Sequence, residues 1–301
     1  MNVAVSGSSG FIGSALVPSL AAGGHRVLRL VRGVVPGADC IRWDPSGAGV
    51  RDVSLLEGLD AVVHLAGENI AGGRWTERRK AEIRRSRVDG TRRLVEAFGK
   101  LARPPKVLVV ASAIGFYGDR GGEVLTEESP AGHDFLAQVC REWEAAAAEA
   151  AKLGVRVVSP RFGIVLSPDG GALQKMLLPF RLGAGGKVGS GQQNWSWIAL
   201  DDVVGAIQHA LVSEALAGPV NVVAPAAVTN ADFTRVLGRV LRRPTIAPLP
   251  AFAARLMLGE MADALLLASA RVVPKRLQET GYPFRYPDLE GALRHLLGRA
   301  R

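Results

Sequence analysis

Residues 2–13 read Asn2-Val3-Ala4-Val5-Ser6-Gly7-Ser8-Ser9-Gly10-Phe11-Ile12-Gly13. The apolar run at residues 3–5 predicts a buried strand, which passes directly into the spacing Gly7-x-x-Gly10-x-x-Gly13. The apolar residues 15–17 follow with helical spacing. The stretch therefore predicts a strand, a glycine loop and a helix in succession.

Each of the three glycines is expected at its position for a different steric reason. Gly7 allows a tight turn, Gly10 lets a phosphate approach bare backbone, and Gly13 lets the helix pack closely on the strand. Free N–H groups at the helix start then face an anion. We expect a dinucleotide diphosphate here rather than an ordinary glycine-rich turn, with cofactor contacts from Gly7, Ser9, Gly10, Phe11, Ile12 and Gly13.

Composition indicates a globular protein. The 301 residues are 48% hydrophobic and 22% charged, enough for one large α/β domain or a main domain with a smaller lobe. The only cysteines, Cys40 and Cys140, lack the spacing of metal ligands and suit a reducing compartment. No signal segment or apolar run of membrane-spanning length is visible, so we expect a cytoplasmic protein with no membrane contact and no bound metal.

A net charge of +9 raises the possibility of nucleic-acid binding. The densest basic run, residues 74–87, is interrupted by Glu77 and Glu82 and has the spacing of a solvated helix face. A nucleic-acid partner is therefore the less favoured interpretation.

A second strand is expected over residues 26–31, followed by Arg32. At this place in dinucleotide folds an acid accepts from the ribose 2′-hydroxyl, whereas an arginine pairs with a 2′-phosphate. Arg32 therefore favours NADP(H) over NAD(H), unless it is only a surface arginine. A third strand over residues 40–44 ends with Trp43 and Asp44, which can line an adenine pocket; Asp44 can equally begin a turn before Pro45.

Two further strands end in small or hydroxyl-bearing residues. Residues 59–67 predict a strand leading to Leu65, Ala66 and Gly67, where backbone can approach the cofactor, and His64 in that strand is expected to be buried. Residues 107–111 form the most apolar strand, and Ala111 at its end is a further cofactor contact. Helices are expected over residues 75–98 and 135–152, and a sixth strand over residues 155–159.

This alternation predicts an α/β fold with a Rossmann-type doubly wound parallel sheet and a smaller C-terminal substrate lobe. We place the nucleotide-binding core at residues 1–168. Residues 169–301 form a mixed region that contributes later Rossmann elements at about residues 198–225, including a helix to about Ser213 and a strand at residues 219–223, and then the lobe, with a helix capped near Asn230.

Three stretches are informative together: the glycine loop, Asp60-x-Val62-x-His64-Leu65-Ala66-Gly67 and Trp197-Ile198-x-x-Asp201-Asp202. In these residues the sequence resembles the extended short-chain dehydrogenase/reductase superfamily. More narrowly it resembles the atypical, sugar-nucleotide epimerase-like branch, known as NAD(P)-dependent epimerase/dehydratase-like proteins. The residues of this narrower likeness are Ser112-Ala113-Ile114-Gly115-Phe116-Tyr117-Gly118, Arg161-Phe162-Gly163-Ile164-Val165-Leu166, Trp195-Ser196-Trp197-Ile198 and Gly281-Tyr282-Pro283-Phe284-x-Tyr286-Pro287.

The resemblance implies a Tyr-x-x-x-Lys acid/base pair at the start of the helix after Ser112, but residues 135–143 contain neither tyrosine nor lysine. The hydroxyls left for catalysis are Ser112 and Tyr117; Tyr117 is either a proton donor or a structural tyrosine. The resemblance also implies that Arg161 and Gly163 pass the nicotinamide, although Arg161 can instead pair with an acid. Substrate-lining residues are expected at Gln193, Trp195 and Trp197, unless the tryptophans only pack in a core.

Two functions stay open at this point. One is an NADP(H)-dependent epimerase, dehydratase or reductase acting on a sugar nucleotide or another small carbonyl compound. The other is a non-catalytic NADP(H)-binding sensor or scaffold, which would explain an intact glycine loop without the acid/base pair. The sequence names no substrate, and it leaves open whether the protein is a monomer or a homodimer.

Overall fold

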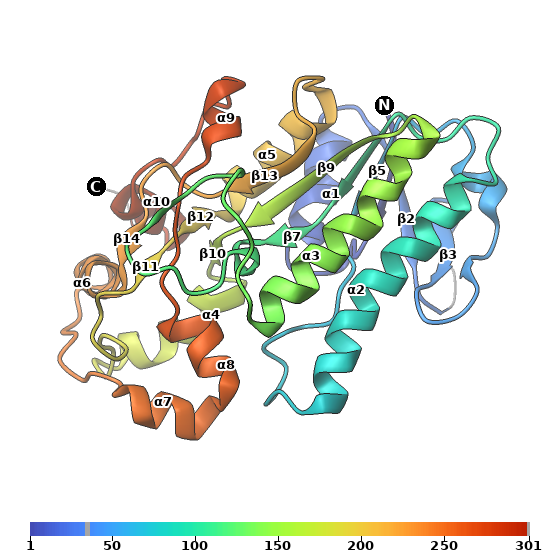
Figure 1. Ribbon diagram of the computed structural model, residues 1–301. Helices are drawn as coiled ribbons and strands as arrows, with labels where there is room; N and C mark the ends of the chain where they lie inside the picture. The colour runs from blue at the N-terminus through green and yellow to red at the C-terminus, as the bar shows by residue number, and fades with distance from the viewer. Residues whose placement is uncertain (34–36, 300–301) are drawn as a thin grey trace.

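In the computed structural model, which describes residues 1–33 and 37–299, a twisted sheet forms the centre and helices cover both of its faces (Figure 1). Helices α2 and α3 pack side by side on one face, and α1 and α5 pack together on the other. The strands of this sheet are β1 (Asn2–Ser6), β2 (Arg26–Val31), β3 (Cys40–Asp44), β4 (Gly49–Val50), β5 (Ala61–His64), β6 (Val107–Val110), β7 (Ser112–Ala113), β9 (Arg156–Phe162) and β13 (Gly218–Val222). The covering helices are α1 (Gly13–Ala22), α2 (Glu77–Phe98), α3 (Phe135–Ala148) and α5 (Leu200–Val212).

The sheet has the doubly wound order β13-β9-β6-β5-β1-β2-β3-β4. All neighbouring pairs are parallel except β3 and β4, which are antiparallel. The chain runs outward from β1 to β2 and β3, and then crosses back to β5, which pairs with the other side of β1. A change of winding direction opens a crevice beyond the carboxyl ends of the strands, and here it lies between β1 and β5.

The predicted strands and helices largely coincide with the observed ones. The predicted strands at residues 26–31 and 40–44 are confirmed as β2 and β3. Helix α2 begins two residues later than predicted because Thr76 is its N-cap and accepts from the Arg79 N–H. Helix α3 ends at Ala148 and continues as a 3₁₀ turn, Glu149–Leu153, which stops at Gly154 with φ +75°.

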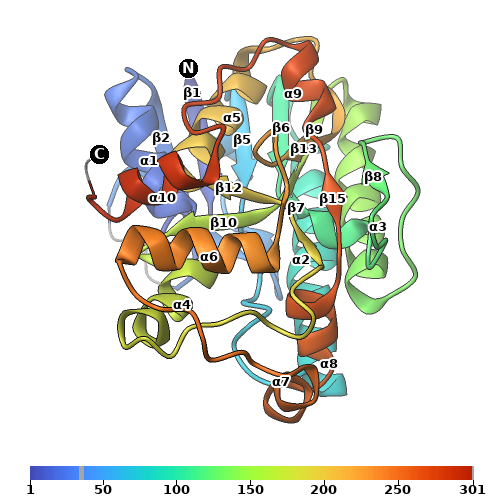
Figure 2. The same cartoon turned by 90° about the vertical axis from the view of Figure 1, so that its left-hand side faces the viewer.

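The C-terminal lobe has its own apolar core beside the sheet (Figure 2). This core is built from α4, α6, α10 and the short strands, with Trp195, Trp197 and Phe233 among its buried side chains. The elements that follow β9, apart from α5 and β13, are β10 (Ile164–Ser167), α4 (Gly171–Arg181), β11 (Asn194–Trp195), β12 (Trp197–Ala199), β14 (Val228–Thr229), α6 (Asn230–Leu241), α7 (Ala251–Leu258), α8 (Glu260–Ala262), α9 (Lys275–Glu279) and α10 (Leu289–Leu296). Of these, α9 packs on β13 of the central sheet, where Leu277 joins the main core. A two-stranded pair, β8 (Val124–Leu125) and β15 (Arg271–Val272), ties the lobe to the loop after β7.

Two polar residues that begin helices of this region, Asn230 and Asp202, are buried. Helix α6 is capped by Thr229, which accepts from the Asp232 N–H, while the predicted cap Asn230 is buried and accepts from the Val188 N–H. Asp202 is also buried, where it accepts from the Tyr282 hydroxyl and thereby anchors the C-terminal segment on α5. No helix within residues 1–33 and 37–299 combines the length and the apolar character needed to cross a membrane.

His64 at the end of β5 is buried, as predicted, and its Nδ1 lies 2.6 Å from Ser6 Oγ on β1. Burial lowers the pKa of His64 to about 4, so the imidazole is neutral in the folded protein at pH 7. An unfolded histidine has a pKa of about 6.5. Between these values the unfolded chain binds a proton that folded His64 does not bind, so His64 lowers the free energy of unfolding as pH falls from 6.5 toward 4.

We therefore expect His64→Asn to reduce the acid sensitivity of the fold. Between pH 7 and pH 5 the wild type should lose about 2 kcal/mol more of its unfolding free energy than the variant does. Urea unfolding at the two pH values measures the difference, with His133→Asn, at an exposed position, as the control. Equal losses in wild type and His64→Asn would contradict this assignment.

Candidate functional site

The glycine loop joins β1 to α1 at the crevice, and its glycines are required sterically. Gly7 has φ +66°, and a Cβ placed on it would lie 2.9 Å from the Ala66 backbone nitrogen. A Cβ on Gly13 would lie only 2.2 Å from the Gly7 carbonyl oxygen. Gly10 N–H donates to that same oxygen at 2.9 Å and closes the turn. The loop can adopt this conformation only with glycine at positions 7 and 13.

The backbone of this loop is ready to bind an anion. The Phe11 and Ile12 N–H groups have no acceptor within the part of the chain that the structure describes, and no side chain caps the start of α1. A cavity of about 530 Å³ adjoins them, lined by Ser9, Gly10, Phe11, Ser14, Ala15, Asp169 and Leu200. Uncapped N–H groups beside an open cavity, at the positive end of a helix dipole, fit a diphosphate.

Arg32, Trp43 and Asp44 lie on the β2–β3 side of the crevice. Arg32 is exposed just beyond the carboxyl end of β2, where a 2′-phosphate would be contacted. Trp43 is buried, and its ring meets that of His64 edge-on at 5.9 Å between centroids. The sequence left two roles open for Asp44, lining an adenine pocket or beginning a turn. In the structure it begins a turn, because its Oδ1 accepts from the Ser46 N–H at 3.0 Å and the Gly47 N–H at 2.9 Å.

The ends of β5 and β6 form the other side of the crevice. Leu65 and Ala66 are half-buried next to Gly7, and Gly67 beyond them is exposed. Ala111, buried at the end of β6, donates its N–H to the His64 carbonyl at 3.0 Å. These residues place bare backbone on the side of the crevice opposite Arg32.

Ser112 belongs to a polar network with Glu144 and Arg161. The sequence analysis named Ser112 and Arg161 as site residues but not Glu144. The Ser112 hydroxyl donates to Glu144 Oε1 on α3 at 2.6 Å. Arg161 on β9 donates to both oxygens of the same carboxylate, each at 2.8 Å, and its side chain is only 3% exposed. Arg161 therefore pairs with an acid, which was the second alternative. A bidentate, charge-assisted pair of this kind fixes the carboxylate firmly beside Ser112.

Glu144 was missed by the sequence analysis, although a signal existed. It lies four residues after Cys140 and eight after Leu136, so all three share one face of α3. Leu136 packs near Gly115, and the Cys140 thiol lies 3.8 Å from the Ala113 carbonyl oxygen, so this face is turned to the segment after β6. Burial raises the pKa of Cys140 to about 12, so Cys140 is a thiol at neutral pH.

Tyr117 is placed as a structural tyrosine. Its side chain is 0% exposed, and its hydroxyl donates toward Asn221 Oδ1 at 2.6 Å and the Thr126 carbonyl at 2.9 Å while accepting from Arg161. Burial raises the pKa of this phenol. A ring enclosed on all sides, with its hydroxyl already bonded, cannot turn toward a ligand in the crevice, so we do not retain Tyr117 as the proton donor.

Four other predicted site residues have clear packing roles in the structure. A Cβ on Gly163 would lie 2.6 Å from the carbonyl oxygen of Ser196, which joins β11 to β12, so glycine is needed there for the close approach of this segment. Gln193 is buried and donates to the Val188 and Leu266 carbonyls at 3.0 Å. Trp195 and Trp197 are core residues whose indole N–H groups donate to the Leu266 and Ala226 carbonyls. Their polar atoms are used to hold the lobe together.

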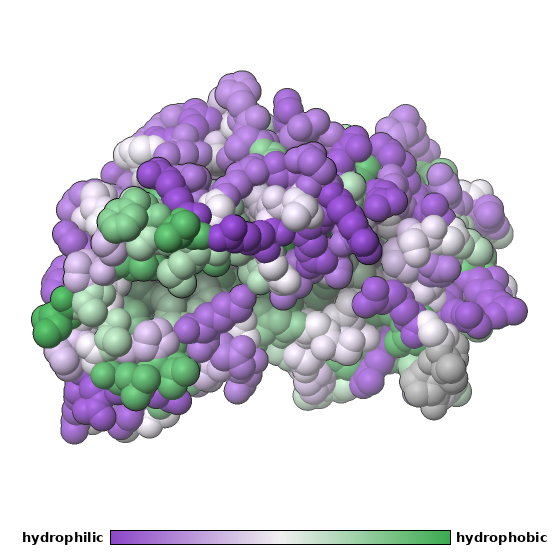
Figure 3. Space-filling view, turned by 90° about the horizontal axis from the view of Figure 1, so that it is seen from below, coloured by the Kyte–Doolittle hydropathy of each residue, from purple (hydrophilic) through white to green (hydrophobic). Residues whose placement is uncertain are grey.

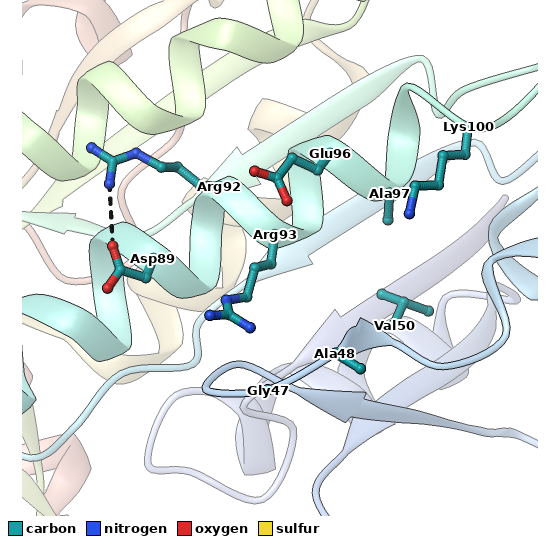
Figure 4. Close-up of a pocket in the computed structure, with 9 residues that line it drawn as sticks. All are labelled: Gly47, Ala48, Val50, Asp89, Arg92, Arg93, Glu96, Ala97 and Lys100. Atoms are coloured by element: carbon teal, nitrogen blue, oxygen red, sulfur yellow. Dashed lines mark hydrogen bonds and ion pairs between the residues drawn. The ribbon is translucent and has the colours of Figure 1, made fainter.

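A second groove, of about 310 Å³, lies between the C-terminal half of α2 and the turn that joins β3 to β4 (Figure 4). It is lined by residues of both charges, and Arg92 is paired with Asp89 at 3.2 Å. The α2 residues in it belong to the C-terminal half of the helix, Asp89 to Ala97, away from the end that follows β5. This groove is therefore separate from the crevice at the glycine loop.

Comparison with known proteins agrees with this geometry. Residues 3–223 match the NAD dependent epimerase/dehydratase family. The chain belongs to this family. Residues 249–296 of the lobe match a domain of unknown function, DUF1731.

Full-length relatives of the chain carry the same family name. The chain is 44% identical to an epimerase family protein of Mycobacterium tuberculosis, MT2273, over 97% of this chain and 96% of that protein. It is 39% identical to the human epimerase family protein SDR39U1, over 99% of this chain and 100% of that protein.

Solved structures extend the likeness to the fold. A crystal structure of human SDR39U1 (isoform 2) with NADPH superposes with a TM-score of 0.90 at 37% identity, covering all of both chains. A nucleoside-diphosphate sugar epimerase from Corynebacterium glutamicum superposes with a TM-score of 0.81 at 40% identity, covering 99% of this chain and 58% of that one. The Rossmann-type fold and the epimerase-like family membership predicted from the sequence are confirmed.

Proposed function

We propose that this protein is an NADP(H)-dependent epimerase- or reductase-like enzyme acting on a sugar nucleotide or another small carbonyl compound. The observation that carries the proposal is the glycine loop: its Phe11 and Ile12 N–H groups lack acceptors within residues 1–33 and 37–299, and Ser9, Gly10 and Phe11 of the loop line a cavity. A bound NADPH in the human relative's structure supports a nicotinamide cofactor at this place.

The residues around the crevice fit such a cofactor in three parts. The loop from Gly7 to Gly13 would hold the diphosphate, and Arg32 would meet the adenosine ribose. Leu65, Ala66, Gly67 and Ala111 would lie along the nicotinamide half. When bound, the cofactor supplies hydride transfer.

Ser112 and Glu144 are the groups we propose for the proton that accompanies hydride transfer. A substrate hydroxyl that donates to Ser112 Oγ can release its proton there while the Ser112 proton passes to Glu144 Oε1, 2.6 Å away. The reverse transfer protonates a carbonyl oxygen during reduction. Leu136 and Cys140 share this face of α3 with Glu144. Neither can accept the proton, because leucine has no ionisable group and the Cys140 thiol, with a pKa of about 12, stays protonated.

The substrate would enter from the carboxyl side of the sheet. The surface seen from below is hollowed, and hydrophobic residues gather around the hollow (Figure 3). Helices α4 and α7 lie at the lower end of the molecule in Figures 1 and 2. They carry the exposed apolar side chains Leu178, Phe252, Leu256 and Met257, and exposed Leu182 follows the end of α4. Such an opening suits a small organic substrate with an apolar portion.

Arg32→Ala tests the preference for the phosphorylated cofactor. Because a charge-assisted contact to the 2′-phosphate contributes about 1.5–3 kcal/mol, we expect NADPH affinity to fall about 10-fold or more. NADH affinity should stay within about twofold of wild type, since NADH lacks that phosphate. Titrations monitored by nicotinamide fluorescence measure both constants, with exposed Arg42→Ala as the control. Equal losses for the two cofactors would contradict the role of Arg32.

Activity itself is tested with purified protein, NADPH or NADP⁺, and a panel of carbonyl compounds and sugar nucleotides. The proposal predicts cofactor oxidation or reduction, or epimerised product, with at least one member of the panel. Ser112→Ala should remove that turnover without weakening NADPH binding. Tight NADPH binding without turnover on any member would instead favour a sensor or scaffold.

A further inference from the structure

Exposed apolar side chains gather on one surface of the C-terminal lobe. This surface, called the α4–α7 surface below, consists of residues 171–192 and 242–258. It carries six of the eleven large hydrophobic side chains that are exposed in the described part of the chain: Leu178, Leu182, Ile246, Phe252, Leu256 and Met257. Each of the six is between 61% and 81% exposed. Apolar side chains gathered in this way, rather than scattered singly, indicate a surface that a partner covers.

The two stretches of the α4–α7 surface are joined by backbone contacts. Arg243 Nε donates to the Arg181 carbonyl at 2.9 Å, and the Leu249 N–H donates to the Lys187 carbonyl at 2.9 Å. Helices α4 and α7 lie together at the lower end of the molecule (Figures 1 and 2), and the view from below shows a hollow with hydrophobic residues around it (Figure 3). The surface is therefore continuous and concave.

The apolar side chains lie in two helical rows. Phe252 and Leu256 are four residues apart on α7, and Leu178 and Leu182 are four residues apart at the end of α4. Side chains four residues apart share one face of a helix. An amphipathic helix binds to such a surface by laying its own apolar face into the hollow.

The charged side chains of the α4–α7 surface are all cationic. Residues 171–192 and 242–258 contain neither aspartate nor glutamate. Their cations, all exposed, are Lys175, Arg181, Lys187, Arg242, Arg243 and Arg255. Arg255 pairs with Asp263 at 2.9 Å, and the other five have no carboxylate partner within residues 1–33 and 37–299. A surface of this kind favours a partner that is apolar at its centre and acidic at its rim.

Shape and charge together distinguish between the possible occupants. A second copy that used the same surface would bring two cationic surfaces together, which like-charge repulsion opposes. A bilayer is flat and would leave the hollow unfilled. A helix, which is about 10–12 Å wide with its side chains, can enter a hollow between two helices.

We propose that the α4–α7 surface binds an acidic amphipathic helix of a partner protein. The apolar face of that helix would contact Phe252, Leu256 and Leu178, and its carboxylates would pair with Arg181 and Lys187. The inference goes beyond the proposed function and does not depend on it, because no residue of this surface lines the cavity at the glycine loop. Since the hollow is also the opening proposed for the substrate, a bound helix would cover that opening.

The test uses the full-length protein and a fluorescein-labelled peptide of about 20 residues, long enough to form a helix. Leucines at i, i+3, i+4 and i+7 give the peptide an apolar face, and glutamates flank that face. We expect saturable binding in a fluorescence anisotropy titration. Two control peptides should bind about 10-fold more weakly or worse: one with the same residues in scrambled order, and one with lysine in place of glutamate.

Matched variants locate the binding site of the peptide. Phe252→Ser combined with Leu256→Ser should weaken binding about 10-fold or more, because both apolar contacts are lost. Val212→Ser, at a comparably exposed position of α5, should bind the peptide as wild type does. Arg181→Gln combined with Lys187→Gln should weaken binding about threefold or more at low salt and reduce its salt dependence. All these side chains are exposed, so urea unfolding should be unchanged.

Three results would overturn the inference. One is the absence of saturable binding by the acidic peptide, or equal binding of its scrambled form. Another is binding to phosphatidylglycerol vesicles, but not to the peptide, that the Phe252→Ser and Leu256→Ser pair abolishes, since this would identify a lipid surface. The third is a wild-type dimer in sedimentation that the same pair dissociates. NADPH titration of the same samples keeps the two proposals separate, because a loss of NADPH binding alone would contradict only the proposed function.

Discussion

Arg161→Met should destabilise the protein by about 3–5 kcal/mol, because it leaves the Glu144 carboxylate, whose side chain is only 15% exposed, without its partner. The Arg161 side chain is 3% exposed and donates to both oxygens of Glu144 at 2.8 Å. It also donates to the Tyr117 hydroxyl, and the same guanidinium lies 3.4 Å from the Phe116 ring centroid. One substitution therefore removes the contact that joins β9, α3 and the segment after β6.

Urea unfolding measures this loss, and two variants serve as controls. Arg84→Met removes an ion pair to Glu142 at the surface, and it should cost less than about 1 kcal/mol. The double variant Arg161→Met with Glu144→Leu removes both buried charges, so it should be more stable than Arg161→Met alone. An Arg161→Met protein as stable as wild type would show that Glu144 is solvated or paired elsewhere.

Gly13→Ala should weaken NADPH binding by about 100-fold or more, which corresponds to about 3 kcal/mol. The new Cβ would lie 2.2 Å from the Gly7 carbonyl oxygen and 2.8 Å from Ser8 Cα, and both are backbone atoms that no rotamer change can move. Either the loop or α1 must shift, so the Phe11 and Ile12 N–H groups no longer converge on one anion. The unfolding free energy should fall as well.

Gly10→Ala separates binding from folding. A Cβ there meets only the Gly7 carbonyl oxygen, at 3.1 Å, and Gly10 is exposed on the cavity. We expect unfolding free energy within about 1 kcal/mol of wild type and NADPH affinity about 10-fold lower, because the methyl group lies where the phosphate approaches. Gly122→Ala, with nothing within 4 Å, is the matched neutral control. If both loop variants bound NADPH normally, the diphosphate would have to lie elsewhere.

The sequence predicted those parts of the fold whose signals are local. Strands β2 and β3 are short runs bounded by turn residues, and the glycine loop carries its spacing within seven residues. The end of α3 was extended to Lys152 because the alanine-rich run contains no stop before Gly154, and the 3₁₀ turn that ends it differs little from an α-helix in sequence.

The polar interior of the site depends on contacts between distant residues. Glu144 could be recognised as a site residue only from the structure, in which β9 places Arg161 beside it, because the two are 17 residues apart in sequence. The basic run at residues 74–87 has the spacing of a solvated helix face, and it is Trp143 on α3 that gives Arg87 an inward position. Trp195 and Trp197 were candidates for a sugar-binding cleft, but indoles suit a core equally well, and only the tertiary packing distinguishes the two.

The measurement that bears most directly on this account is calorimetric titration of the folded wild-type protein with NADPH. The crevice between β1 and β5 predicts saturable uptake of one NADPH per chain, weakened by Gly10→Ala and unaffected by Gly122→Ala. A folded protein that takes up neither NADPH nor NADH would contradict the account.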